Sequence, residues 1–92
     1  MTTRYIGTVI RLHRKAAGMS RADLARLSGV GKTMIYDLEH GKETVQLRGL
    51  LLILDALSIK LRFESRVMES LKELIERGEI DESSGAPHQR TR

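Results

Sequence analysis

Apolar positions in the first part of the chain recur with the three- and four-residue spacing of α-helices. One such stripe over residues 6–17 predicts a first helix, which Gly18 ends. Ser20 is a favourable N-cap for a short second helix over residues 21–28. The next residue, Gly29, is expected to take the left-handed conformation of a tight turn.

Two further helices are predicted before the pattern changes. The third covers about residues 32–40, and Gly41 ends it. The fourth is capped by Thr44, and its expected buried face consists of Leu47, Leu50, Leu51, Leu54 and Leu57. This fourth helix is apolar nearly all round, so its other side needs a partner outside the domain; that side carries Leu52, Ile53 and Ala56.

After the fourth helix the apolar period changes to two. Ile59, Leu61 and Phe63 alternate with charged residues, which predicts one β-strand. A lone strand needs a ladder partner for its backbone groups, and the same strand of a second copy supplies one across a two-fold axis. The pattern therefore predicts a homodimer, whose expected interface contains Ile59, Leu61, Phe63, Leu52 and Ile53.

The last part of the chain contains one more helical segment. Helical spacing over Arg66–Arg77 predicts an amphipathic helix that Gly78 stops. A helix this short is marginal alone, so its apolar side must pack on the dimer or on a partner. Three parts are thus predicted: a four-helix domain over residues 1–58, a strand and helix over residues 59–78, and a disordered tail over residues 79–92.

Charge adds a candidate ligand to this fold. The chain has 92 residues and a net charge of +4, and residues 1–32 contain seven basic side chains against the single acidic Asp23. This concentration suggests a polyanionic partner, and a merely solvated surface is the alternative. The chain lacks an apolar run near the ~20 residues that span a bilayer, and it shows no signal-peptide pattern. We expect a soluble, cytoplasmic, nucleoid-associated protein that does not bind membranes.

Residues 21–40 have the spacing of a helix-turn-helix. Ala25 is the small residue where two helices cross, Gly29 follows four positions later in the turn, and Ile35 packs the helices together. An ordinary αα-hairpin uses the same packing chemistry and is the alternative interpretation of this spacing. The flanking helices and the surrounding basic residues favour DNA binding.

A helix-turn-helix places the exposed N-terminal side of its second helix in the major groove. The residues expected to contact bases there are Lys32, Thr33, Tyr36 and Asp37. The residues expected to contact phosphates are Arg21, Lys42, Arg11, Arg14 and Lys15. For each basic residue, a solvated surface position is the alternative.

Several motifs resemble the Cro/lambda-repressor-type (XRE) helix-turn-helix family. They are Ile10-Arg11, Gly18-Met19-Ser20, Asp23-Leu24-Ala25, Ser28-Gly29-Val30 and residues 35–42. The resemblance spans about residues 6–57 and implies a mostly α, lambda-repressor-like domain that represses transcription by binding double-stranded operator DNA. Two positions depart from the family pattern. Arg21 stands where Gln is common, and Gly31 offers no side chain where the third helix often begins with a polar residue.

The continuation over residues 54–63 resembles the HipB-like antitoxin branch, in which a strand after the fourth helix pairs between subunits. This resemblance implies a dimeric repressor of its own operon that neutralises a HipA-type serine/threonine kinase toxin. The helix over Arg66–Arg77 goes beyond the minimal antitoxin. A stand-alone XRE-type regulator is one alternative. Another is a protein-interaction module that has lost DNA contact. Gly31 supports this alternative because it offers no side chain to a base, whereas Lys32 argues against it.

Signals for other chemistry are weak. Gly31-Lys32-Thr33 imitates the end of a phosphate-binding P-loop, but Arg26 stands where that motif needs its first glycine. The three histidines are too scattered for a metal site, and the absence of cysteine excludes a thiolate site. We therefore expect no enzyme activity, no cofactor and no bound metal.

Overall fold

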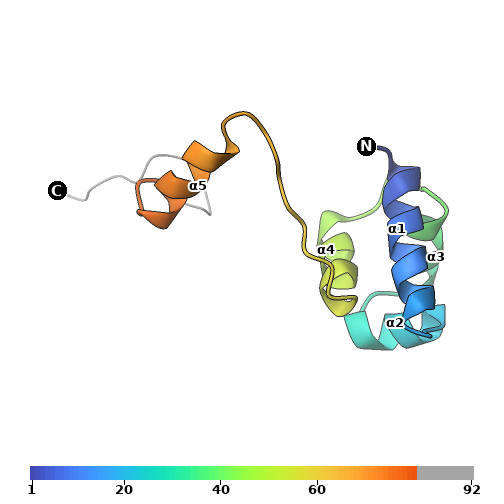
Figure 1. Cartoon of the computed structure of the whole chain (residues 1–92). Helices are drawn as coiled ribbons and strands as arrows, with labels where there is room; N and C mark the ends of the chain where they lie inside the picture. The colour runs from blue at the N-terminus through green and yellow to red at the C-terminus, as the bar shows by residue number, and fades with distance from the viewer. Residues whose placement is uncertain (81–92) are drawn as a thin grey trace. The chain divides into compact units, whose positions relative to one another are not determined.

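The computed structural model describes residues 1–80, which belong to two compact units. The first unit, residues 1–61, contains four helices: α1 (Thr3–Ala16), α2 (Arg21–Ser28), α3 (Lys32–Glu39) and α4 (Leu47–Ala56) (Figure 1). The second unit begins at Arg62 and contains α5 (Met68–Glu76). Residues 81–92 of the predicted tail lie outside the described residues.

Local signals set the bounds of α2 as predicted. Ser20 accepts a hydrogen bond from the Asp23 backbone N–H at 3.0 Å, and the Asp23 carboxylate accepts one from the Ser20 N–H at 2.9 Å, which completes a capping box. At the other end, Gly29 has a φ of +76° and its N–H donates to the Ala25 carbonyl. A left-handed residue costs little only as glycine, so the predicted turn is confirmed.

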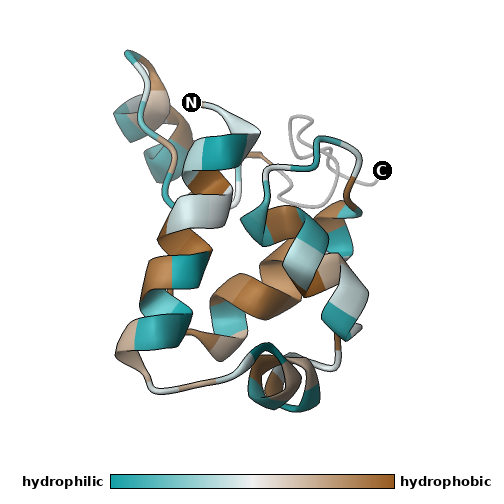
Figure 2. Cartoon of the chain, turned by 90° about the vertical axis from the view of Figure 1, so that its right-hand side faces the viewer, coloured by the Kyte–Doolittle hydropathy of each residue, from teal (hydrophilic) through white to brown (hydrophobic). Residues whose placement is uncertain are grey.

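The core of the first unit joins all four helices. Hydrophobic positions gather on the inward sides of these helices, and the outward sides are mostly hydrophilic (Figure 2). The buried apolar side chains are Ile10, Leu24, Val30, Ile35, Leu38, Ile53 and Leu54. Each such burial stabilises the fold by about 1.5–3 kcal/mol relative to an exposed side chain.

Gly7 allows α1 to cross α3 closely. A Cβ atom at this position would overlap the carbonyl oxygen of Leu38 and lie 3.0 Å from that of Glu39. Both atoms are backbone, so neither can move without shifting α3. The hydrophobic pattern did not indicate this close approach.

The predictions for α4 were partly wrong. The helix begins at Leu47 with Gln46 as its N-cap, and Thr44 does not cap it. Leu47 is 65% exposed, whereas Ile53 is fully buried in the core of its own unit. An all-round apolar helix carries no periodic contrast, so its pattern could not say which side faces the core.

The segment after α4 contains neither helix nor strand over residues 59–65. The strand was predicted to pair with a second copy of the chain, and it stays a prediction. Helix α5 lies within the predicted range 66–77, and none of its residues is buried. None of the helices within residues 1–80 is long and apolar enough to cross a membrane.

Candidate nucleic-acid interface

The exposed side of α3 forms a shallow hollow with the N-terminal end of α2. The hollow has a volume of about 400 Å³ and is lined by Arg21, Lys32, Thr33 and Tyr36. Three of these residues were predicted to contact bases, and Arg21 was predicted to contact phosphate. The tertiary structure thus brings together two cationic side chains, a hydroxyl and a phenol, which we call the α3 hollow.

The first turn of α3 adds backbone donors to this surface. Gly31 is the N-cap of α3, and within residues 1–80 no side chain caps the first turn of this helix. The first N–H groups of a helix have no intrahelical acceptor, and they carry partial positive charge. Lys32 and Thr33 are exposed at this end. The arrangement suits a negatively charged ligand.

A buried carboxylate contacts one of the side chains that line the hollow. Glu39, at the end of α3, accepts hydrogen bonds from Arg14 Nε at 2.6 Å and Arg14 Nη2 at 3.0 Å. It also accepts one from Arg21 Nε at 3.1 Å. We call Arg14, Arg21 and Glu39 the Glu39 triad, and it ties α1, α2 and α3 together. Arg14 Nη1 adds a hydrogen bond to the Met19 carbonyl at 2.8 Å.

The two arginines of the triad lower the pKa of its carboxylate. Burial raises the pKa of Glu39, but the hydrogen bonds and charges of Arg14 and Arg21 outweigh burial and lower that pKa below its usual value. The hydrogen bond to Glu39 raises the pKa of Arg14. Glu39 and Arg14 are therefore charged at neutral pH. Arginine side chains are always charged in proteins, so with Arg21 the triad has a net charge of one positive.

Arg21 and Tyr36 lie against each other. The Arg21 guanidinium carbon is 5.1 Å from the centroid of the Tyr36 ring, within the range of a cation–π interaction. The Tyr36 ring also stacks on the His40 ring, with 3.9 Å between the centroids. Two of the side chains that line the α3 hollow therefore contact each other.

The other predicted phosphate contacts divide into three groups. Arg11 and Lys15 are exposed on α1. Lys42 is exposed, and its Nζ lies 3.4 Å from Asp37 Oδ2, so Asp37 is partly neutralised. The prediction for Arg14 was wrong, because this side chain is buried and paired with Glu39, where it cannot reach DNA.

Sequence reasoning also missed the role of Glu39. Arg14 stands four residues after the core residue Ile10, and Glu39 four residues after the core residue Ile35. Four-residue steps keep a side chain on the same face of a helix, so both charged residues lie in apolar stripes. A basic and an acidic residue in facing apolar stripes was the signal that could have identified this buried pair.

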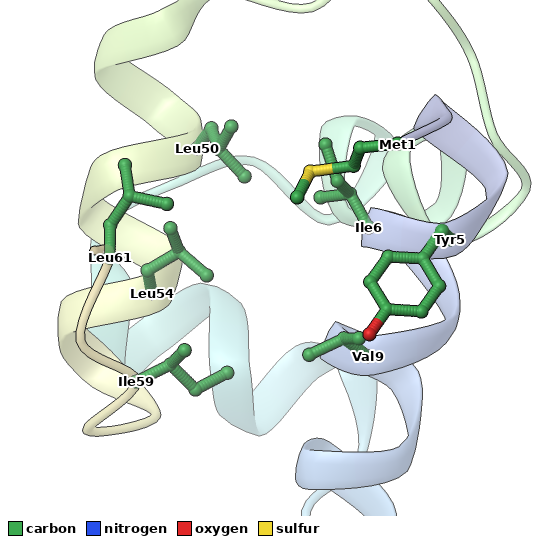
Figure 3. Close-up of a pocket in the computed structure, with 8 residues that line it drawn as sticks. All are labelled: Met1, Tyr5, Ile6, Val9, Leu50, Leu54, Ile59 and Leu61. Carbon is green, nitrogen blue, oxygen red and sulfur yellow. The ribbon is translucent and has the colours of Figure 1, made fainter. Parts of the chain in front are cut away.

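An apolar groove lies between α1 and α4 on another part of the first unit. In Figure 3, the side chains from α4 and the following segment face those from the N-terminal part of the chain. The groove has a volume of about 130 Å³ and is lined by Met1, Tyr5, Ile6, Val9, Leu50, Leu54, Ile59 and Leu61.

The groove contains two of the predicted dimer residues. Ile59 and Leu61 line it, Leu52 is half-buried, and Phe63 in the second unit is 72% exposed. The prediction for Ile53 was wrong, because the core of its own unit buries this side chain completely. Four of the five predicted residues thus retain some exposed surface.

Comparison with known proteins agrees with this geometry. A family model described as helix-turn-helix matches residues 10–63. An uncharacterised HTH-type transcriptional regulator, y4mF, of Sinorhizobium fredii (strain NBRC 101917 / NGR234) is 40% identical over 52 residues, which cover 56% of this chain and 68% of the relative. The matched range 10–63 includes the α3 hollow, the Glu39 triad and the segment that follows α4.

Proposed function

Because the chain belongs to the helix-turn-helix family and is a DNA-binding transcriptional regulator, we propose that it represses transcription with the exposed side of α3 in the major groove of an operator. The observation that carries this proposal is the α3 hollow, where Arg21 of α2 lines the same surface as Lys32 and Thr33 of the uncapped first turn of α3. Major-groove recognition needs such donors at the N-terminal end of the second helix of the motif.

The exposed residues divide between two tasks. Lys32 donates to guanine O6 and N7, and Thr33 contacts a thymine methyl group or donates to an acceptor. Arg21, Arg11, Lys15 and Lys42 bind phosphates, which orient the protein on the duplex without specifying sequence. Asp37, which pairs with Lys42, accepts a hydrogen bond from an exposed base amino group.

An electrophoretic mobility shift tests the function directly. The full chain is titrated against a duplex spanning the DNA upstream of its own reading frame and against a shuffled duplex of the same length. We expect tighter binding to the upstream duplex and weaker binding to both as salt rises, because phosphate contacts release counterions. Equal and negligible binding to both duplexes would instead favour a protein-interaction module without DNA contact.

We further propose that the regulator is a homodimer. Ile59 and Leu61 belong both to the apolar groove and to the alternating segment for which a second copy supplies the ladder partner. A two-fold dimer also presents two copies of α3 to a palindromic operator with half-sites about one helical turn apart, or a multiple of that distance.

Sedimentation equilibrium tests the dimer. The wild type is expected at twice the 10.4 kDa of one chain. Leu61→Lys places a charge in the interface, and we expect this variant to sediment as a monomer. Leu27→Lys, at a similarly exposed leucine on α2 outside the groove, is the matched control and stays dimeric. A wild-type monomer at all concentrations would contradict the dimer and leave DNA binding intact.

The finer proposal is that this repressor is the antitoxin of a HipA-type serine/threonine kinase toxin and regulates the operon that encodes both. It rests on the resemblance of residues 54–63 to the HipB-like branch. Co-expression with a kinase-like protein encoded beside it tests the proposal. Co-purification and loss of kinase toxicity support an antitoxin, whereas free kinase in every fraction indicates a stand-alone regulator.

A further inference from the structure

Two residues of α3 hold the guanidinium of Arg21 in place. Glu39 accepts its Nε–H at 3.1 Å, and the ring of Tyr36 lies 5.1 Å below its central carbon. Arg21 belongs to α2, so these contacts join the first helix of the motif to the second. The side chain remains 31% exposed and lines the α3 hollow.

The hydrogen bond to Glu39 uses only one side of the guanidinium. Within residues 1–80, the two Nη groups of Arg21 donate no hydrogen bond to protein. The Glu39 carboxylate is already shared with Arg14, so it does not neutralise both cations. Arg21 therefore presents free donors and uncompensated positive charge at the surface of the hollow, which suits a phosphate oxygen.

Tyr36 has a different environment from the other side chains predicted to contact bases. Its ring contacts both Arg21 and His40, and the side chain is 49% exposed. Lys32 and Thr33 instead stand exposed at the start of the helix. A ring that contacts both a guanidinium and an imidazole is placed to support Arg21, whereas Lys32 and Thr33 remain available to bases.

We propose that Glu39 and Tyr36 are positioning residues for Arg21, and that the held guanidinium binds a backbone phosphate of DNA beside α3. This inference rests on the proposed function. An unrestrained arginine loses rotamer entropy when it binds, so restraint by Glu39 and Tyr36 increases affinity for the same phosphate. Tyr36 then acts through Arg21 and does not contact a base.

A double-mutant cycle tests this inference. Affinity for a short fluorescein-labelled duplex of mixed sequence is measured by anisotropy, because phosphate contacts do not depend on sequence. Arg21→Gln is expected to weaken binding about ten-fold and to lower the salt slope by about one for each chain. Tyr36→Leu is expected to weaken binding about three-fold. In the Arg21→Gln background, Tyr36→Leu is expected to change nothing further.

Conservative variants separate positioning from direct contact. Tyr36→Phe keeps the ring without the hydroxyl, and we expect wild-type affinity. Glu39→Gln removes the charged acceptor of the Arg21 Nε–H and so restrains Arg21 less. In the Arg21→Gln background, Glu39→Gln is expected to leave the affinity of the folded protein for DNA unchanged. Circular dichroism at the temperature of the titration checks that each variant is folded.

Each adverse outcome has a distinct meaning. Additive effects of Tyr36→Leu and Arg21→Gln, or a loss of affinity in Tyr36→Phe, would overturn the inference because Tyr36 would then contact DNA itself. Both outcomes leave the proposed function intact. Wild-type protein with no salt-dependent binding to any duplex would contradict the proposed function as well.

Discussion

The Arg14 guanidinium donates to both carboxylate oxygens of Glu39 inside the first unit, with Nε 2.6 Å from Oε2 and Nη2 3.0 Å from Oε1. The side chain of Glu39 is completely buried. Buried ions are tolerated when they are paired and hydrogen-bonded. Removal of one partner leaves the other charge buried, with a desolvation cost that no interaction offsets.

Arg14→Ala is therefore expected to destabilise the fold by about 3–5 kcal/mol. Arg11→Ala, an exposed arginine on the same helix, is the matched control and is expected to stay within about 0.5 kcal/mol of the wild type. Urea denaturation followed by circular dichroism measures both. Similar losses in the two variants would show that the buried pair contributes nothing beyond a surface arginine.

The lowered pKa of Glu39 predicts a loss of stability in acid. Arg14 and Arg21 favour the charged carboxylate in the folded state, so the folded pKa lies below the unfolded value of about 4.3. This contribution is fully present above the unfolded pKa and is lost as pH falls through the folded pKa. Urea denaturation from neutral pH to about pH 3 measures the change.

Glu39→Gln isolates this contribution from those of other carboxylates. Asp23, whose pKa is lowered by its hydrogen bonds with Ser20, titrates in the same direction and remains in the variant. We expect the stability difference between the wild type and Glu39→Gln to shrink as pH falls. A difference that is constant with pH would contradict a charged Glu39 in the folded state.

Lys32 is expected to contribute to sequence recognition. Lys32→Ala removes a donor to guanine and is expected to cost about 1–3 kcal/mol on the operator and to relax sequence preference. Lys72→Ala, at an exposed lysine on α5, is the control and should bind as the wild type. Mobility shifts with the upstream and shuffled duplexes measure both variants. An unchanged ratio of the two affinities in Lys32→Ala would remove Lys32 from the base contacts.

The close approach at Gly7 makes α1 sensitive to a single methyl group. Gly7→Ala is expected to destabilise the fold by about 1–3 kcal/mol, because the new Cβ overlaps the Leu38 carbonyl and α1 must move away from α3. The neighbouring Thr8→Ala changes an exposed position and is expected to have little effect. Thermal unfolding compares the two, and a Gly7→Ala melting temperature at or above that of the wild type would contradict the close packing.

Ser58 offers a stabilising substitution. It has a φ of +57° directly after Leu57, the C-cap of α4, where the Ile59 N–H donates to the Leu54 carbonyl at 2.8 Å. Ser58→Gly is expected to stabilise the fold by about 0.5–1 kcal/mol, because a left-handed conformation strains a residue that has a Cβ. Ser58→Ala keeps the strain, so an equal gain in both variants would exclude backbone conformation as the cause. Urea denaturation measures the gain.

Much of the helix-turn-helix could be predicted because its signals are local. The Ser20 cap, the Gly29 turn and the four-residue steps of Ile10 and Ile35 act within one or two turns of the chain. The same reasoning placed Arg21, Lys32 and Thr33 at the N-terminal ends of two adjacent helices. The structure gathers these residues around one hollow.

The side of α4 that faces the core could not be predicted from local signals. Ile53 faces the core and Leu47 faces outward, although both are large and apolar. Their burial depends on which side of α4 the other three helices cover. A helix that is apolar all round has no periodic stripe that would identify this side.

The sequence by itself determined the helices around the turn, the Ser20 and Gly29 caps of α2 and the concentration of positive charge in residues 1–32. Only the tertiary structure decided which arginine stays at the surface and which is buried. Arg14 and Arg21 are alike in composition, but Glu39, 25 residues beyond Arg14, draws the first into the interior and holds the second at the surface. The physical reason is desolvation, because a buried charge persists only beside a partner that the fold brings to it.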